Sequence, residues 1–458
     1  MEAVDAVVAH QGLITLLPTV LVLVLAVTLR RPIEALLLGA IVGIIILNGS
    51  DFVTVTAATT MRVLQDDDLV WVILVCGAMG SLIGLFIRTG SLASFTELLA
   101  KRAQSKSSTL LATWFLGIAL FVDDYLNSIT LGAAMRKLAD KYKISREMLA
   151  YVIDSTAAPV SVLIPLSTWG FFFSKQLEDA GLAADGEGWM TYVSGIPYML
   201  YPWIAVIMVP LVIYGKIPLF GPMKKAELRA ASGQCIPPGA EHVEAANEFV
   251  VEKPDIKRYT SLFVVPMIAL VGFTVWYDMD FLPAIYMTLA LTIIIIIATR
   301  LLDHHDTLHT AVEGFKSMLE ALAIIFAAYV LKDINDQLGF TTYILEATRP
   351  FMSANTLPFI IFAVMGVIAF ATGSSWGMFV IAMPVIAELT AATDSNIALV
   401  VGAALSASTF GSHACLYADA TVLTAQSSGC TALQHALTQL PYALIAATIS
   451  LIGFALLA

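Results

Sequence analysis

The sequence predicts an all-α polytopic membrane protein with about ten transmembrane helices plus two re-entrant hairpins, arranged as inverted repeats with broken helices. Three observations predict it: the composition, the placement of Lys and Arg, and a weak internal repeat. Of the 458 residues, 59% are hydrophobic and 13% are charged, a balance typical of chains embedded in lipid. Six apolar runs of at least 17 residues are each long enough for the hydrocarbon core: 13–29, 69–87, 196–214, 259–276, 282–298 and 440–457.

Residues 1–68 are predicted to form an N-terminal two-helix segment. The chain begins MEAVDAVVAH, which lacks the basic region of a secretory signal, so the run 13–29 is interpreted as a retained helix. The four cysteines show no CxxC spacing, which argues against a disulfide framework or a zinc site. We interpret them as packing residues.

Lys and Arg are concentrated in alternate loops, and such loops lie on the cytoplasmic side of a membrane. The basic clusters lie at 30–31, 88–106, 136–146 and 216–258, and acidic loops alternate with them at 66–69, 177–188 and 278–280. The topology assigned from these loops places all but four of the 24 Lys and Arg residues on the cytoplasmic side. The four exceptions are Arg62, Lys175, Lys332 and Arg349.

The first repeat, 69–214, is predicted to contain a re-entrant hairpin at 108–135. The basic stretches 101–106 and 136–146 both belong on the cytoplasmic side, but two full crossings between them would need about 40 residues. A hairpin that turns back midway through the membrane needs fewer residues than two full crossings. Its tip falls within FVDDYLNSITLGAAM, where the two adjacent carboxylates of Asp123 and Asp124 lie in an apolar run. Irregular backbone at that depth requires cover from protein or a water-filled cavity.

A broken helix is predicted at 148–175, because Pro159 and Pro165 interrupt a segment too long for one plain helix. A cytoplasmic loop, 215–258, and connecting helices, 259–318, are predicted to follow it. Gly77, Gly80 and Gly84 within the first repeat are interpreted as a close helix contact, and Arg88 as a topology anchor.

The second repeat, 319–458, follows the same order, with a hairpin at 357–386 and a broken helix at 397–424. A constant offset of 249 pairs Gly90 with Gly339 and Gly117 with Gly366. The loop 385–395 has no Lys or Arg, so it is predicted to lie outside, and the two repeats are inverted. This architecture places a transport site at the midplane. The second break is predicted at the small polar residues Ser406, Ser408, Thr409, Gly411 and Ser412.

Two blocks of the chain resemble a known family. The stretch from FVDDYLNSIT to LIPLSTWG, 121–170, is similar to a block of the NhaC-type sodium/proton antiporter family, within the ion-transporter superfamily. FGSHACLYADATVLTAQSSGC, 410–430, resembles its second block, where family members commonly carry G-D-x-x-S-P-x-S-D-T-T. Here only Asp419 and Thr421 of its second half remain, and a carboxylate and a proline are missing.

The resemblance implies secondary active transport, with sodium/proton antiport across the inner (plasma) membrane as the leading function. Relatives of this family also move organic solutes. The altered second block therefore leaves open an alternative, Na⁺- or H⁺-coupled transport of a small organic solute such as an amino acid or a carboxylate. Na⁺ and/or H⁺ and the membrane lipid are the expected partners. The organic solute and a homodimer are left open, and no nucleic acid and no bound cofactor are expected.

Intramembrane carboxylates are costly and are usually functional, and oxygen ligands suit a hard cation such as Na⁺. The residues predicted to bind the cation or proton are Asp123, Asp124, Asn127, Asp154, Ser155, Thr156 and Asp419. Within this set, Asp123, Asn127 and Asp154 are the predicted Na⁺ ligands. The structural alternatives are that the two hairpin acids cap the tip, that Asp154 is a helix N-cap, and that Asn127 satisfies the backbone of the tip.

A second set of side chains is predicted to face an organic solute, because these residues surround the same four breaks. The set is Ser161, Thr168, Trp169, Ser374, Ser375, Trp376, Ser406, Ser408 and His413. For His413 two interpretations stay open, a proton carrier near neutral pH or a buried histidine with a hydrogen-bond partner.

An enzyme is not expected. GSSWG at 373–377 fits G-x-S-x-G, but that motif works at a strand-to-helix elbow, whereas here it falls at the tip of an apolar hairpin. Neither GxxxxGK[ST] nor HExxH occurs, so ATP-driven transport and a zinc protease have no support. Broken inverted repeats favour alternating access over an open channel.

Overall fold

The computed structural model describes residues 10–29, 32–100, 103–121, 123–246, 256–278, 280–373 and 375–458. Its regular secondary structure in these ranges is entirely helical. The predicted topology markers Arg30, Arg31, Lys101 and Arg102 lie outside the described residues.

The helices fall into two halves. The first half comprises α1 (Leu17–Leu29), α2 (Pro32–Asn48), α3 (Phe52–Val63), α4 (Asp67–Arg88), α5 (Ser91–Ala100), α6 (Lys106–Ala119), α7 (Asp124–Lys141), α8 (Arg146–Asp154), α9 (Ala158–Leu163), α10 (Thr168–Asp179), α11 (Gly188–Gly195), α12 (Leu200–Ile213), α13 (Gly221–Ala231) and α14 (Glu241–Ala246). The second half comprises α15 (Ile256–Trp276), α16 (Phe281–Ala298), α17 (His304–Lys316), α18 (Leu319–Leu338), α19 (Phe340–Thr348), α20 (Leu357–Thr372), α21 (Ser375–Thr393), α22 (Ile397–Ala414), α23 (Asp419–Ser428) and α24 (Ala432–Leu457).

Among the described residues, six helices are long and apolar enough to cross a membrane. The number rises to eight if each of two bent helix pairs forms one span, and shorter apolar helices such as α20 add to the set. The chain is therefore a multi-pass membrane protein. The number of about ten spans and the inversion of the repeats stay predictions.

Breaks occur inside both predicted hairpins. α6 ends at Ala119 and α7 begins at Asp124, and the two helices pack against each other. α20 ends at Thr372 and α21 begins at Ser375, with Gly373 between them at a φ of 69°. Glycine suits this left-handed backbone because it has no Cβ.

The first broken helix is interrupted twice. Residues 155–157 separate α8 from α9, and residues 164–167 separate α9 from α10. The chain bends by 45° at the second of these interruptions. Pro165 lies in the second interruption, as predicted. Pro159 instead lies in the first turn of α9, where its missing N–H removes no helical hydrogen bond.

The second break is not where the small polar residues predicted it. α22 continues through Ser406, Ser408, Thr409, Gly411 and Ser412 and ends at Ala414. The hydroxyl of Thr409 donates to the carbonyl of Leu405 within the same helix, which is a way for a helix to accommodate such residues. The break lies at 415–418.

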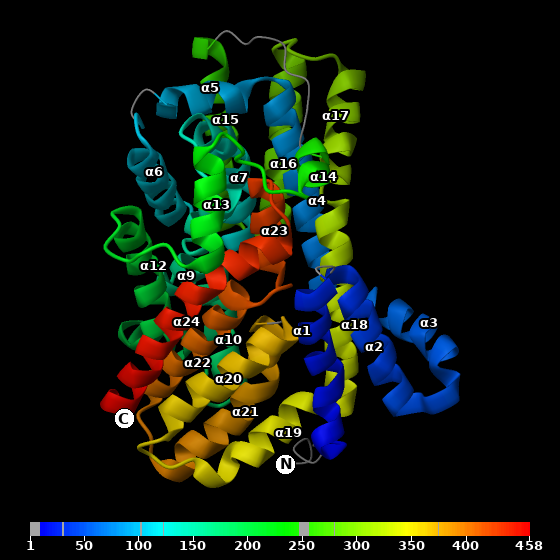
Figure 1. Cartoon of the computed structure of the whole chain (residues 1–458), viewed down its shortest axis with the longest axis vertical. Helices are drawn as coiled ribbons and strands as arrows, with labels where there is room; N and C mark the ends of the chain where they lie inside the picture. The colour runs from blue at the N-terminus through cyan, green and yellow to red at the C-terminus, as the bar shows by residue number, and fades with distance from the viewer. Residues whose placement is uncertain are drawn as a thin grey trace.

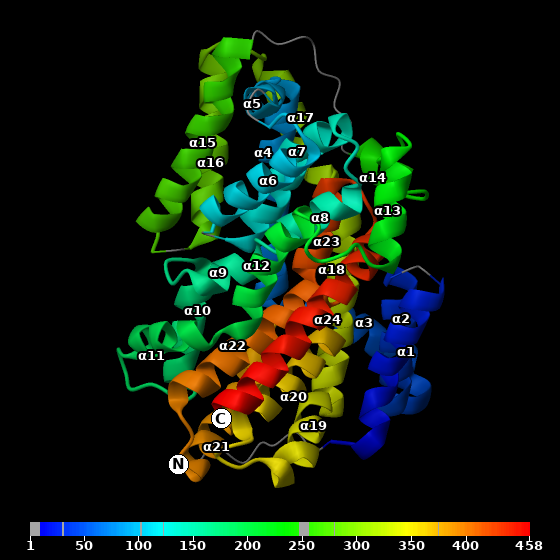
Figure 2. The same cartoon turned by 60° about the vertical axis from the view of Figure 1, so that its left-hand side comes forward.

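The helices that hold these breaks pack together at the centre of the molecule. α22 packs on α20 and α24, and α23 packs on α7 and α8. Figure 1 shows α22, α23 and α24 running together through the molecule, with α1, α2 and α3 to one side next to α18. Figure 2 shows the pair α15 and α16 beside α5 at one end.

The predicted glycine contact is confirmed, and its partner is α17. A Cβ on Gly80 or Gly84 would meet the backbone of Gly314, and one on Gly77 would overlap the ring of Phe315. The hydroxyl of Ser81 donates to the carbonyl of Ala311 at 2.7 Å. Small residues allow α4 and α17 to approach this closely.

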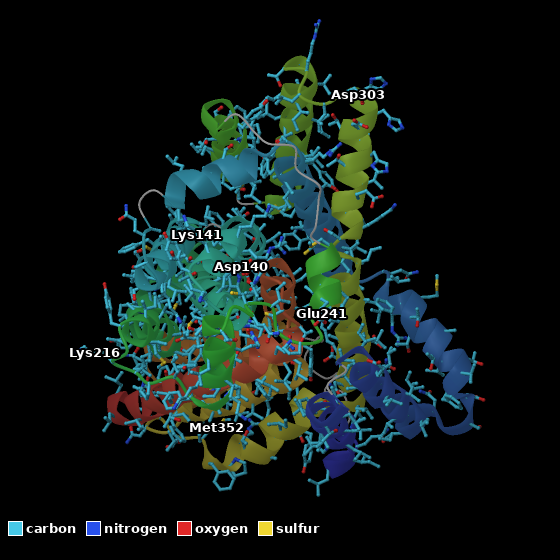
Figure 3. The ribbon with its side chains drawn as sticks, turned by 45° about the horizontal axis from the view of Figure 1, so that its top comes forward. Asp140, Lys141, Lys216, Glu241, Asp303 and Met352 are labelled. Carbon is cyan, nitrogen blue, oxygen red and sulfur yellow. The ribbon has the colours of Figure 1, made fainter. Side chains whose placement is uncertain are left out.

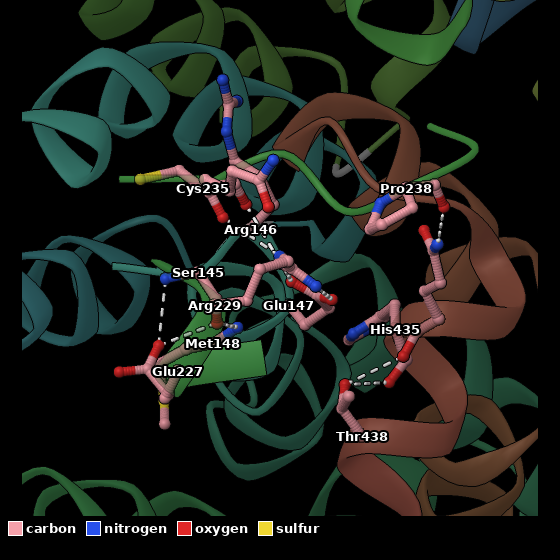
Figure 4. A network of polar contacts seen from close by, with 12 residues as sticks. Ser145, Arg146, Glu147, Met148, Glu227, Arg229, Cys235, Pro238, His435 and Thr438 are labelled. Atoms are coloured by element: carbon pink, nitrogen blue, oxygen red, sulfur yellow. Dashed lines mark hydrogen bonds and ion pairs between the residues drawn. The ribbon is translucent and has the colours of Figure 1, made fainter. Parts of the chain in front are cut away.

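Ion pairs and hydrogen bonds to two buried carboxylates fasten α13 to the starts of α6 and α8, and Figure 4 shows those at α8. Arg229 donates through Nη1 and Nη2 to the two carboxylate oxygens of Glu147 at 2.9 and 2.7 Å. Glu227 accepts from the backbone N–H and the hydroxyl of Ser145 and pairs with Lys106. The predicted cytoplasmic loop is thus anchored to the core.

Removing one partner of the Glu147–Arg229 pair should be destabilising. Only 4% of the Glu147 side chain is exposed, so Arg229→Ala would leave a buried carboxylate without its countercharge, at a cost of about 3 kcal/mol. We expect a lower melting temperature of the detergent-solubilised protein. Lys316→Ala, which breaks the exposed pair with Glu313, is the matched control. Equal melting temperatures for the two variants would contradict this prediction.

The predicted inversion of the repeats can be tested by labelling. Asp303 and Met352 lie towards opposite ends of the view in Figure 3, and Lys141 lies between them. Gln104 and Lys141 flank the first hairpin and Ala392 follows the second, and all three are exposed. In a background without native cysteines, Gln104→Cys and Lys141→Cys should react with a membrane-impermeant thiol reagent only from the cytoplasmic face, and Ala392→Cys only from outside. Labelling of Gln104→Cys and Lys141→Cys from opposite faces would contradict the hairpin.

Candidate functional site

Asp123 caps the N-terminus of α7. Its Oδ1 accepts hydrogen bonds from the backbone N–H groups of Tyr125 and Leu126, both at 3.0 Å. Its Oδ2 accepts from the hydroxyl of Thr168 at 2.9 Å. The side chain is fully buried. Asp123 therefore ties the hairpin tip to the first turn of α10, and both of its oxygens have partners.

Asp124 and Asn127 present oxygen atoms of a different kind. They lie three residues apart on α7, a spacing that puts them on one face of the helix. Both side chains are buried, at 3% and 0% exposure. Oδ1 of each has no hydrogen-bond partner among the described residues, and the indole of Trp169 lies beside the Asp124 carboxyl group. Two unpaired oxygens thus share one buried face.

The amide of Asn127 also holds two breaks together. Nδ2 donates to the carbonyl of Gly117 at 2.7 Å and to that of Thr156 at 2.8 Å. These carbonyls belong to the C-terminal end of α6 and to the break after α8. Gly117 is required here, because a Cβ would overlap the side chain of Thr156. Asn127 therefore supplies donors that the broken helices lack.

Asp154 forms a second buried group at the C-terminal end of α8, so it is not an N-cap. Its Oδ2 accepts from His435 Nε2 at 3.0 Å and from Gln439 Nε2 at 2.6 Å. Its Oδ1 has no partner among the described residues. Gln439 also donates to the carbonyl of His413. One α24 side chain thus joins the end of α8 to the end of α22.

His413 is buried with partners on both ring nitrogens. Its Nε2 lies 3.0 Å from the hydroxyl of Ser155, and its Nδ1 lies 2.7 Å from the hydroxyl of Tyr201. A hydroxyl can donate or accept, so either tautomer of a neutral ring is satisfied. This is the environment of the buried, hydrogen-bonded histidine that the sequence left open.

The second break meets α7 through hydroxyl groups. Tyr125 donates to Asp419 Oδ2. Thr424 donates to the hydroxyl of Ser128, and Ser427 donates to its carbonyl, both at 2.8 Å. The first two turns of α7 therefore contact α23 along most of its length.

The remaining predicted residues lie around the other helix ends. Ser161 donates to the carbonyl of Phe121 at 3.1 Å. Ser375 donates to the carbonyl of Ser408 at 2.8 Å, and Ser408 donates back to the carbonyl of Ser375 at 3.3 Å.

Ser406 is buried, and its hydroxyl has no partner among the described residues. Ser374 and the side chain of Trp376 lie outside the described residues.

The structure separates the predicted residues into three neighbouring groups. The hairpin group contains Asp123, Asp124, Asn127 and Thr168, and the Asp154 group contains Ser155 and His413. The third group surrounds a cavity of about 260 Å³ between α4, α7, α18 and the breaks of the second repeat. Among the predicted site residues that the structure describes, Ser375 and Asp419 line this cavity.

Sequence reasoning missed several polar partners. His435 and Gln439 lie four residues apart in the apolar helix α24, and both are fully buried. That spacing puts two polar side chains on one helix face and was a usable signal. Tyr125 and Tyr201 gave no such signal, because a single sequence does not show which distant residues they contact.

These groups present carboxylate and amide oxygens without hydrogen-bond partners among the described residues. No set of three or more His, Cys, Asp and Glu side chains that could hold a metal ion occurs in the part of the chain that the structure describes. Carboxylate, amide and backbone oxygens are instead the ligands of Na⁺-like cations.

Loss of the Asn127 amide should destabilise the whole site. Asn127→Ala would leave the buried carbonyls of Gly117 and Thr156 without donors, and we expect a loss of about 2 kcal/mol or more. Thermal unfolding of the purified protein measures this. Asn48→Ala, at the exposed end of α2, is the control and should change little. A variant at position 127 as stable as this control would contradict the role.

A model of the Na+/H+ antiporter family matches residues 180–458. An uncharacterized protein of Haemophilus influenzae is 26% identical over 478 residues, which cover 96% of this chain and 90% of that protein. The structure of Neisseria gonorrhoeae MtrF, described as illuminating a class of antimetabolite efflux pumps, shares 14% identity with a TM-score of 0.40 over 96% of this chain and 94% of its own. Because the family model covers more than half of the sequence, this chain belongs to the Na+/H+ antiporter family.

Proposed function

We propose that this secondary transporter exchanges Na⁺ for H⁺ across the inner (plasma) membrane. Family membership supports antiport in general. The observation that carries the proposal is the pair of unpartnered oxygens, Asp124 Oδ1 and Asn127 Oδ1, on one buried face of α7.

A buried carboxylate whose oxygen has no partner is unfavourable in its charged form. A proton or a cation relieves that cost, and the two compete because each neutralises the same charge. Such competition at Asp124 is the physical basis of exchange. Asn127 would supply a neutral oxygen ligand, and the broken helices would supply carbonyl oxygens.

The other predicted acids take different positions in this proposal. Asp123 holds the hairpin tip through Thr168, and its oxygens lie one residue away from the proposed ligand. Asp154, with an unpartnered Oδ1, is proposed as a second carboxylate available to the ion. Ser155 and Thr156, which follow it in the break, place hydroxyl and carbonyl oxygens near that group.

The proposal includes alternating access. Two inverted repeats, 69–214 and 319–458, would place the ion at the midplane, with ten spans and two re-entrant hairpins around it. α13 and its ion pairs would cover the cytoplasmic side. A second candidate function, cation-coupled transport of a small organic solute, is favoured by the cavity at Asp419.

The charge of Asp124 is the test of Na⁺/H⁺ exchange. Asp124→Asn keeps the shape of the side chain and removes the charge. In proteoliposomes with an imposed pH gradient, Na⁺ should collapse the gradient with the parental protein, and this variant should lose at least about 90% of the rate, as expected for an essential proton carrier.

Asp306→Asn, an exposed carboxylate in the first turn of α17, is the matched control and should exchange normally. Parental exchange by Asp124→Asn with an unchanged pH dependence would overturn the proposed site. Exchange absent from the parental protein as well would overturn Na⁺/H⁺ antiport itself.

A further inference from the structure

We propose that the cavity beside Asp419 binds a small zwitterionic solute, with its ammonium group at Asp419 and its carboxylate at Lys332. The inference rests on the second candidate function, cation-coupled transport of a small organic solute, and not on Na⁺/H⁺ exchange. It assigns a solute class to a site distinct from the Asp124 and Asn127 oxygens.

The size of the cavity is the first argument. Its volume of about 260 Å³ is many times the roughly 15 Å³ that holds one water molecule. A dehydrated Na⁺ needs close oxygen ligands on all sides and gains nothing from so large a space. A space of this size with mainly apolar walls lies near the lower limit of ligand pockets, roughly 300 Å³, and so suits a small organic ligand.

The charges on the wall give the sign of the solute. Three acidic residues, Asp67, Asp68 and Asp419, line the cavity together with one basic residue, Lys332. The excess of negative charge disfavours a dicarboxylate, because like charges repel at short range. It favours a solute with a positive group.

Aromatic rings strengthen the preference for an ammonium group. Trp71, Tyr125, Tyr329 and Tyr417 all line the cavity, and the rings of Trp71 and Tyr125 lie 5.7 Å apart. The faces of such rings attract cations, most strongly where water is excluded. A carboxylate surrounded by aromatic rings is therefore suited to a protonated amine.

Asp419 is oriented for that role. Tyr125 donates to its Oδ2, and the residue lies in the first turn of α23, where the helix dipole stabilises a negative charge. Both interactions favour the charged form of this carboxylate at the wall of the cavity. It stands ready to accept hydrogen bonds from an ammonium group.

Lys332 is the proposed binding partner for the carboxylate of the solute. It is one of only four basic residues that the charge pattern places outside, so the positive-inside rule gives no reason for it. Its side chain is only 16% exposed, and Nζ lies 3.7 Å from Asp66 Oδ2 and 5.1 Å from the centre of the Tyr329 ring. At 3.7 Å the contact with Asp66 leaves donors of the ammonium group for a carboxylate in the cavity.

Binding can be measured without transport. The probes are two matched triplets: leucine, isoamylamine and isocaproate, and phenylalanine, phenethylamine and hydrocinnamate. We expect at least one amino acid to raise the melting temperature of the full-length protein most, its amine to bind at least about tenfold more weakly, and its carboxylic acid to have no effect, because each lost ion pair costs about a factor of ten or more.

Two variants test which residue binds the carboxylate of the solute and which binds its ammonium group. Lys332→Gln should reduce amino acid binding to the level of the amine and leave amine binding unchanged. Asp419→Asn should weaken both by at least about tenfold. Trp71→Leu, which changes no charge, should also weaken both if Asp419→Asn fails to fold. Lys316→Gln and Asp306→Asn, at exposed positions of α17, are the matched controls and should bind normally.

Stabilisation by Na⁺ separates the two proposals. The melting temperature of Asp124→Asn should no longer rise when Na⁺ is added, but this variant should still bind the amino acid. The melting temperature of Lys332→Gln should still rise with Na⁺. Three results would each overturn the zwitterion site. They are the absence of binding by every member of both triplets, tightest binding by the carboxylic acid, and a ratio of amino acid affinity to amine affinity that is the same in Lys332→Gln as in the parental protein. Such results alongside solute-free Na⁺/H⁺ exchange would leave the proposed exchange intact.

Discussion

Broken helices inside an apolar protein expose backbone carbonyls that water cannot reach, and the rest of this structure depends on satisfying them. Each unsatisfied group at membrane depth costs several kcal/mol. The side-chain amide of Asn127 donates hydrogen bonds to carbonyls at the ends of two helices, and that of Gln439 donates to the carbonyl of His413. Three hydroxyls do the same at other ends, those of Ser161 for Phe121, Tyr192 for Val162 and Tyr417 for Ala371.

This requirement divides the polar residues into two kinds. Side chains that serve the backbone are fully engaged, as Asp123 is at the start of α7. Other side chains, above all Asn127, use their N–H donors in hydrogen bonds while their oxygen has no partner among the described residues. Such a side chain is held rigidly and still presents a hydrogen-bond acceptor. A rigid acceptor is what ion binding needs, since it loses little entropy when the ion arrives. The structural role and the proposed ion-binding role of Asn127 thus rest on the same side chain.

The sequence predicted the local features of this arrangement better than the distant ones. The charge pattern and the length of the apolar segment predicted a break in the helix around Asp123, where α6 ends and α7 begins, because both quantities are local. The second break was misplaced, since hydroxyls such as that of Thr409 bond within α22. The contact of His435 with Asp154 joins residues 281 positions apart, and no residue type or spacing in a single chain encodes such a pairing.

The two proposed sites share one element, the first turn of α7. The N–H of Tyr125 donates to Asp123, its hydroxyl donates to Asp419 at the cavity, and Asp124 precedes it in the chain. Coupling between two ligands requires an element whose state both of them bias. A cation that neutralises Asp124 changes the field on that turn, and a solute that takes Asp419 changes the partner of the Tyr125 hydroxyl. Movement of this single turn is therefore the shortest physical route by which an ion gradient would act on the solute.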